Sequence, residues 1–185
     1  QVSTDLYESF TGQSTQNVCT KLVQHFNLTA NPKDLELNKR AHFNTLFTTD
    51  KSLNLLDGVH QIIEDYYAND LTLILASSAS MSTIEKVFTR FDLDQYFKAK
   101  ISGASLKASK PHPEIFEKAA QLAGYKQEQC IVIEDSTNGI KAAKSAGSFC
   151  IGYDSLHSKN QDYSQADLVI NAFNEIPFKK ISTLI

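Results

Sequence analysis

The sequence predicts an α/β fold in which helices cover both faces of a mostly parallel sheet. After residue 70, short apolar runs without polar alternation recur, as expected of strands that are buried on both faces. Amphipathic stretches lie between these runs, and strand–helix–strand units of this kind form parallel sheets. The first third of the chain contains no comparable run and is expected to be helical.

Two helices are expected before residue 50. Ser14 can cap the first of them. The second should begin at Asn31–Pro32, because asparagine is a favoured N-cap and proline fits the first helical turn, and it should run to about Phe47. Residues 48–52 are polar and predict a linker. The apolar residues of these helices are expected to be core, among them Val18, Leu22, Phe26 and Phe43.

The rest of the chain alternates between strands and helices. Strands are expected at residues 71–76, 99–102, 130–133, 149–152 and 168–170. A helix is expected near Val59, and the capping box Ser82–Glu85 predicts the start of another. Two further helices, at residues 114–123 and 138–146, each end before a glycine.

Composition excludes several classes of protein. A formal net charge of −3 over 185 residues gives no basic field for nucleic acid. The longest apolar runs are far shorter than a membrane span, and the first residues do not resemble a signal peptide. The three cysteines, Cys19, Cys130 and Cys150, are odd in number and fit small buried side chains in a reducing compartment. A cytoplasmic protein, monomeric or weakly dimeric, is expected.

Ser77 and Ser78 directly follow the first predicted strand. In a parallel sheet, ligands bind at the carboxyl ends of the strands. Small residues there let backbone N–H groups approach an anion, and a hydroxyl adds one more hydrogen bond. An ordinary serine-rich turn would explain the same residues.

Lys110 precedes two prolines, Pro111 and Pro113, which restrict the loop and delay the next helix until Glu114. A lysine held in this way suits a phosphoryl group or another developing negative charge. A solvated loop lysine is the alternative interpretation.

Glu134 and Asp135 end the strand at residues 130–133. Two adjacent acids repel each other unless a cation lies near them. Carboxylate oxygens without a cysteine or histidine cluster favour Mg²⁺ over softer metals. Alternatively, Asp135 or Ser136 caps the helix that follows. The ordered combination with Ser77 and Lys110 favours the metal.

Other catalytic patterns are absent from the sequence. The five histidines show no metal-binding spacing, and no glycine-rich nucleotide loop occurs. The stretch from Gly103 to Lys107 lacks the second glycine of a nucleophile elbow.

The three segments at residues 73–78, 109–116 and 133–140 together resemble motifs of the haloacid dehalogenase superfamily, specifically its β-phosphoglucomutase-like phosphatases. This resemblance implies a Rossmann-like parallel core over residues 53–185 and part of an α-helical cap over residues 1–52. It also implies Mg²⁺, held by Asp135 and Glu134, with Ser77 and Lys110 as catalytic residues that bind the phosphoryl group. Ser78 and Thr15, which is near the loop at Gly12, would contact the substrate.

One motif of the family is missing. Its members carry a nucleophilic aspartate, and a second aspartate two residues later, at the end of a central first strand. The segment Leu55–Val59 contains Asp57–Gly58, but a leucine stands where the first aspartate belongs. Without that strand, the strands ending at Ala76 and Ile133 would each expose an edge. We therefore expect an additional N-terminal segment to supply the nucleophile, and residues 1–185 alone to be inactive.

The resemblance implies a Mg²⁺-dependent phosphatase of small phosphorylated metabolites, with sugar phosphates as candidates, that acts through a phospho-aspartyl intermediate. A β-phosphoglucomutase-type sugar phosphomutase is an alternative, although residues 13–16 lack the basic residue that such mutases carry in this loop. A haloacid dehalogenase would not need the acidic pair. A catalytically inert, phosphate-binding fragment is the alternative from a different class.

Overall fold

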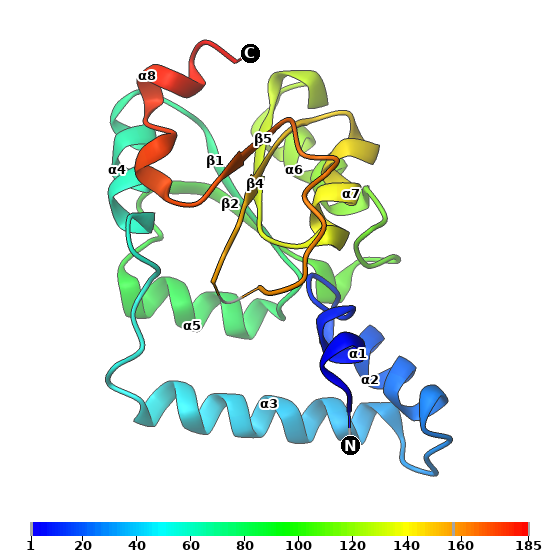
Figure 1. Ribbon diagram of the computed structural model, residues 1–185. Helices are drawn as coiled ribbons and strands as arrows, with labels where there is room; N and C mark the ends of the chain where they lie inside the picture. Colours follow the sequence, from blue (N-terminus) through cyan, green and yellow to red (C-terminus); the bar gives the residue numbers. More distant parts are fainter. Residues whose placement is uncertain (1, 157, 185) are drawn as a thin grey trace.

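Helices surround five short parallel strands in the computed structural model, which describes residues 2–156 and 158–184 (Figure 1). The α-helices are α1 (Thr4–Glu8), α2 (Thr15–His25), α3 (Pro32–Thr49), α4 (Val59–Ala68), α5 (Met81–Phe91), α6 (Glu114–Ala123), α7 (Thr137–Ala146) and α8 (Phe178–Ile181). The strands are β1 (Leu73–Ser77), β2 (Phe97–Ser102), β3 (Ile131–Glu134), β4 (Phe149–Tyr153) and β5 (Leu168–Ile170). The predicted α/β class is confirmed.

The strands form two sheets rather than one. β1 pairs with β2, with Leu75 opposite Lys100, and β3 pairs with β4, with Val132 opposite Cys150. β5 extends the second sheet beside β4, and all three pairings are parallel. The crossover helices predicted from the sequence, α6 and α7, pack against β1, β2 and β4.

β1 and β3 each keep one unpaired edge among the described residues, because β1 has only β2 as a neighbour and β3 only β4. Every residue of β1 and β3 is only half-buried, whereas the three central residues of β4 are buried. The edges expected from the sequence at Ala76 and Ile133 are therefore present. Together, the open edges leave β1 and β3 each able to accept one more strand.

The N-terminal helices α1–α3 form a thin layer with little core. Cys19 is the one buried residue of α2, and α3 buries none of its residues. Phe26, expected to be core, is 37% exposed. The prediction was wrong because helical spacing identifies an apolar stripe but not whether anything covers it. Arg90 of α5 joins the layer to the rest by donating to the carbonyls of Phe47, Asp50 and Leu53.

Two helix boundaries differ from their predicted places. α5 begins at Met81 with Ser80, not Ser82, as its N-cap, because the Ser80 hydroxyl accepts the Thr83 N–H group at 3.3 Å. α3 extends into the expected linker, and the hydroxyls of Thr48 and Thr49 donate to carbonyls one turn earlier. The short helices α1 and α8 were not predicted.

All three cysteines are free; Cys19 and Cys150 are buried as expected, whereas Cys130 is only half-buried. Cys150 is fully buried, and burial, followed by the nearby Glu134 and Asp167 carboxylates, raises its thiol pKa to about 12. Its thiol therefore stays protonated and unreactive at neutral pH. Among the helices that the structure describes, none has the length and apolar character needed to cross a bilayer.

Tyr66 offers a test of how the C-terminal segment is held. Its hydroxyl donates to the buried carbonyl of Ile176 at 2.7 Å. We expect Tyr66→Phe to lower the free energy of unfolding by about 1–3 kcal/mol, because that carbonyl loses its partner. Urea denaturation measures the change. Tyr67→Phe is the control, since Tyr67 is half exposed on the same helix and should cost much less. Equal stability of Tyr66→Phe and the parent would contradict the role of this bond.

Candidate active site

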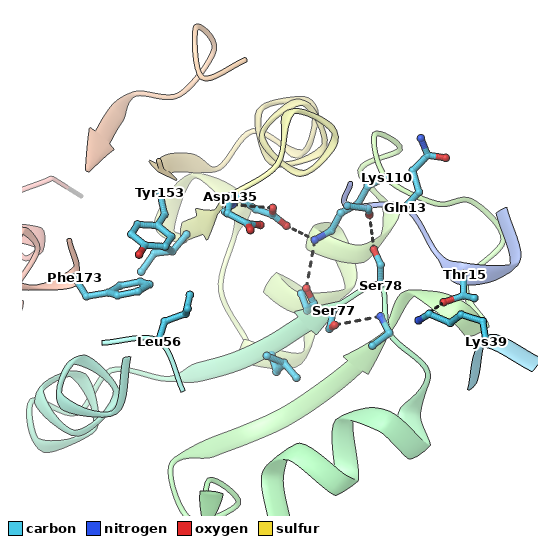
Figure 2. A pocket seen from close by; sticks show the side chains of 16 residues that line it. Gln13, Thr15, Lys39, Leu56, Ser77, Ser78, Lys110, Asp135, Tyr153 and Phe173 are labelled. Carbon is cyan, nitrogen blue, oxygen red and sulfur yellow. Dashed lines mark hydrogen bonds and ion pairs between the residues drawn. The ribbon is translucent and has the colours of Figure 1, made fainter. Parts of the chain in front are cut away.

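The carboxyl ends of β1 and β3 border one cavity of about 510 Å³. Ser77, Lys110, Glu134 and Asp135 all line it, so the three segments singled out in the sequence meet at one place. Figure 2 shows Lys110 between Asp135 and the two serines. The N-terminal layer closes one side of the cavity through Gly12, Gln13, Thr15 and Lys39.

Ser77 and Ser78 take different roles at the end of β1. The Ser77 hydroxyl accepts the Ala79 N–H group at 3.2 Å and borders the cavity. The Ser78 hydroxyl donates to the carbonyl of Gly12 at 2.5 Å, and so connects the N-terminal layer to the site. Gly12 has a φ of +82°, and a Cβ there would overlap the Ser136 hydroxyl. A glycine is therefore required for this close approach.

Lys110 is buried, with only 5% of its side chain exposed, so it is not a solvated loop lysine. Its ammonium is ion-paired with Glu134 Oε1, lies 3.5 Å from the carbonyl oxygen of Ala76, and sits 4.8 Å from the centre of the Phe116 ring. The Lys110–Pro111 peptide bond is cis. These contacts hold a positive charge beside the end of β1.

Glu134 is fixed on both of its oxygens. Oε1 pairs with Lys110, while Oε2 accepts from the Asp135 N–H group at 3.2 Å and from the Ser136 hydroxyl at 3.0 Å. A Cβ at Gly139 would overlap this carboxylate, so the glycine in the first turn of α7 makes room for it. Glu134 is thus held in place mainly by Lys110 and by the start of α7.

Asp135 is the freer of the two acids. Its Oδ2 accepts the Ser158 hydroxyl at 2.5 Å, and its main-chain carbonyl accepts the Tyr163 hydroxyl at 3.3 Å. Ser136, not Asp135, caps α7 by accepting the Gly139 N–H group at 3.0 Å. The carboxylate of Asp135 is therefore not used as a helix cap, and it borders the cavity.

The donor set fits Mg²⁺ as part of a site. Within the described residues, no group of three or more acidic, cysteine or histidine side chains gathers as a metal site. Mg²⁺, however, is commonly bound through one or two carboxylates, with water and substrate phosphate completing its octahedron. Asp135 has an oxygen to offer, whereas Glu134 must share its charge with Lys110.

Lys39 is a candidate that sequence reasoning missed. It lies on α3, yet its ammonium is 3.4 Å from the Thr15 hydroxyl, and both residues line the cavity (Figure 2). Residues 13–16 contain no basic residue, but α3 packs against α2 and supplies one from 24 residues further along the chain. No local sequence signal identifies such a pairing.

Three comparisons connect this chain with known proteins. The family model described as haloacid dehalogenase-like hydrolase matches residues 1–153. Hexitol phosphatase B of Escherichia coli K12 is 29% identical over 151 residues, which are 81% of this chain and 68% of that protein. Phosphorylated carbohydrates phosphatase of Thermotoga maritima is 33% identical over 122 residues, which are 66% of this chain and 56% of that protein.

The fold is similar to solved structures over nearly its whole length. β-Phosphoglucomutase from Clostridium difficile has a TM-score of 0.84 at 25% identity, covering 99% of this chain and 82% of that one. CbbY from Rhodobacter sphaeroides, solved in complex with phosphate, has a TM-score of 0.84 at 22% identity, covering 94% and 80%. The chain thus spans about four fifths of these structures, but only 68% and 56% of the two curated relatives.

Proposed function

This chain belongs to the haloacid dehalogenase-like hydrolase family. We propose that it forms part of a Mg²⁺-dependent phosphatase of small phosphorylated metabolites. The main support for this proposal is that Ser77, Lys110 and Asp135 line one cavity at the carboxyl ends of β1 and β3. Phosphatases of phosphorylated carbohydrates among its relatives support sugar phosphates as the substrate class.

In this proposal Ser77 and Lys110 bind the phosphoryl group. The Ser77 hydroxyl donates to one phosphoryl oxygen, and the Lys110 ammonium offsets the charge that spreads over these oxygens in the transition state. Glu134 keeps the Lys110 side chain in place. Asp135, with Glu134 beside it, would hold Mg²⁺, which supplies further positive charge next to the phosphoryl oxygens.

We propose that the nucleophile is an aspartate on a strand that pairs with both β1 and β3. The support is the open edge on each strand and the half-burial of every residue in them. A parallel strand in that position would end beside Ser77, Lys110 and Asp135, where its carboxylate could attack the phosphorus atom. We assign the strand to a segment outside residues 1–185, and assign α1–α3 within residues 1–52 to a cap that covers the cavity. Thr15 would then face the substrate from the cap, and Ser78 from the end of β1.

A sugar phosphomutase is the second candidate, and Lys39 favours it. A mutase must bind a second phosphate at the end of the substrate away from the reacting one. Lys39 and Thr15 border the cavity on the side of the N-terminal layer, and among the described residues Lys39 forms no ion pair. The two candidates differ in product, because a mutase isomerises glucose 1-phosphate whereas a phosphatase releases inorganic phosphate.

The test compares residues 1–185 with the product of the native gene, whose intact mass reports any residues before Gln1. We expect a heavier native product that hydrolyses hexitol and hexose phosphates with Mg²⁺ and stops when EDTA is added. The 185-residue chain should bind inorganic phosphate without turnover. Isomerisation of glucose 1-phosphate, followed by phosphorus NMR, would instead favour the mutase. A heavier native product that hydrolyses no phosphate ester would refute the phosphatase. A native product with the mass of residues 1–185 and without turnover would favour the inert fragment.

A further inference from the structure

The loop at Ser158–Asp162, between β4 and β5, contacts both the candidate metal ligand and the N-terminal layer. It follows β4 at the carboxyl edge of the second sheet, close to the start of α7. The side chains of Ser158, Asn160 and Gln161 point to three different partners. A single short loop therefore connects parts of the chain that are more than 120 residues apart.

On the side of the sheet, the loop holds the Asp135 carboxylate. Ser158 donates its hydroxyl to Asp135 Oδ2 at 2.5 Å. One oxygen of the carboxylate is thereby occupied, and the rotation of the carboxylate is restricted. Hydrogen bonds of this kind to a metal ligand orient it, and their loss commonly weakens metal affinity by about 10–100-fold.

On the other side, the loop holds α1. Asn160 donates its amide to the Glu8 carboxylate at 2.5 Å, and Gln161 donates to the Glu8 carbonyl at 3.4 Å. Glu8 is the last residue of α1. These contacts require α1 to be docked against the loop.

The loop is also fixed to the first turn of α7, which limits how it can move. The Thr137 N–H group donates to Gln161 Oε1 at 2.9 Å, and the Asp162 N–H group donates to the Thr137 hydroxyl at 2.7 Å. Thr137 lies two residues after Asp135. A shift of the loop would thus move the Asp135 carboxylate, both through the hydrogen bond from Ser158 and through the contacts with the start of α7.

We propose that this loop couples the docking of α1 to the orientation of Asp135, with Ser158 as the positioning residue and Asn160 as the contact with α1. The inference rests on the proposed function, in which Asp135 holds Mg²⁺. Because coupling between two binding events is reciprocal, Mg²⁺ that favours the oriented carboxylate must also favour the docked α1. Binding of the metal and closure of the N-terminal layer would then reinforce each other.

A second contact with the N-terminal layer bypasses the loop and provides a control. Asn138 of α7 donates its amide to the carbonyls of Ser9 at 3.3 Å and Thr11 at 2.8 Å. It holds the same segment but does not contact Asp135. Asn138→Ala should loosen α1 in the absence of metal while leaving the effect of Mg²⁺ on α1 in place.

The experiment uses the native gene product as the parent protein. Titration calorimetry measures its Mg²⁺ affinity, and hydrogen exchange of the α1 amides is measured with and without Mg²⁺. We expect Mg²⁺ to slow exchange in the parent protein. Ser158→Ala should weaken Mg²⁺ binding about tenfold, and Ser158→Thr, which keeps the hydroxyl, should restore it. Asn160→Ala should reduce the slowing of α1 exchange, because only the longer contact from Gln161 to Glu8 then remains between the loop and α1. Lys159→Ala, an exposed change in the same loop, should alter neither quantity.

Two outcomes would overturn the proposal and can be told apart. If the parent protein binds no Mg²⁺, the metal assignment of the proposed function fails and the coupling fails with it. If the parent binds Mg²⁺ but Ser158→Ala binds it equally well, or Asn160→Ala keeps the full parental slowing of α1 exchange, the coupling alone is wrong.

Discussion

Lys110→Met is expected to destabilise the protein by about 3–5 kcal/mol and to abolish phosphate binding. The substitution leaves Glu134, whose side chain is only 9% exposed, as a buried carboxylate without its cation. Hydrogen bonds from the Asp135 N–H group and the Ser136 hydroxyl remain and favour the lower end of that range. The cavity also loses its most deeply buried positive charge, so a bound phosphate would face two carboxylates.

A double variant separates the effect on folding from the effect on binding. Lys110→Met combined with Glu134→Gln removes both charges and should recover most of the lost stability, because no uncompensated ion remains buried. Phosphate binding should stay lost, since neither new side chain carries a positive charge. Urea denaturation and phosphate titration measure the two quantities independently.

Lys118→Met provides the matched control for Lys110→Met. Lys118 pairs with Glu114 at 2.8 Å, but its side chain is 47% exposed, and an ion pair of that kind contributes less than about 1 kcal/mol. A Lys110→Met protein with parental stability and phosphate affinity would remove Lys110 from the proposed site.

The part of the site that sequence could predict is the part defined by strand ends. Ser77, Lys110 and Glu134–Asp135 each follow a recognisable apolar strand or lie in the loop after one, and parallel strands bring such positions to one edge. The α/β class followed from the same alternation of strands and helices, and it is confirmed. Local spacing is enough for these features because the sheet itself dictates their convergence.

Features that depend on packing between distant segments could not be predicted from the sequence. Lys39 reaches Thr15 only because α3 folds back along α2, and the Ser158 contact with Asp135 depends on the path of a loop without regular structure. Phe26 was assigned to the core from its helical stripe, but it is exposed, since a stripe does not show whether another layer covers it.

Asp135→Asn is expected to remove Mg²⁺-dependent activity from the native enzyme while leaving the fold intact. The substitution preserves shape and the acceptor for the Ser158 hydroxyl but removes the charge that would hold the metal. Loss of the metal's charge stabilisation, worth several kcal/mol, lowers kcat/KM by on the order of 10³-fold. Hydrolysis of a hexose phosphate over a Mg²⁺ series provides the measurement.

Asp135→Asn should lower activity without lowering stability, and this difference separates a functional role of Asp135 from a structural one. Asp135 adjoins Glu134, so neutralising it relieves repulsion between two adjacent carboxylates. Asp135→Asn should therefore be at least as stable as the parent without Mg²⁺, and Mg²⁺ should no longer raise its melting temperature. Asp154→Asn, an exposed carboxylate directly after β4, is the control and should keep both activity and the Mg²⁺ effect. A destabilised Asp135→Asn protein that still hydrolyses its substrate with Mg²⁺ would mean that this acid supports the fold and that the metal binds elsewhere.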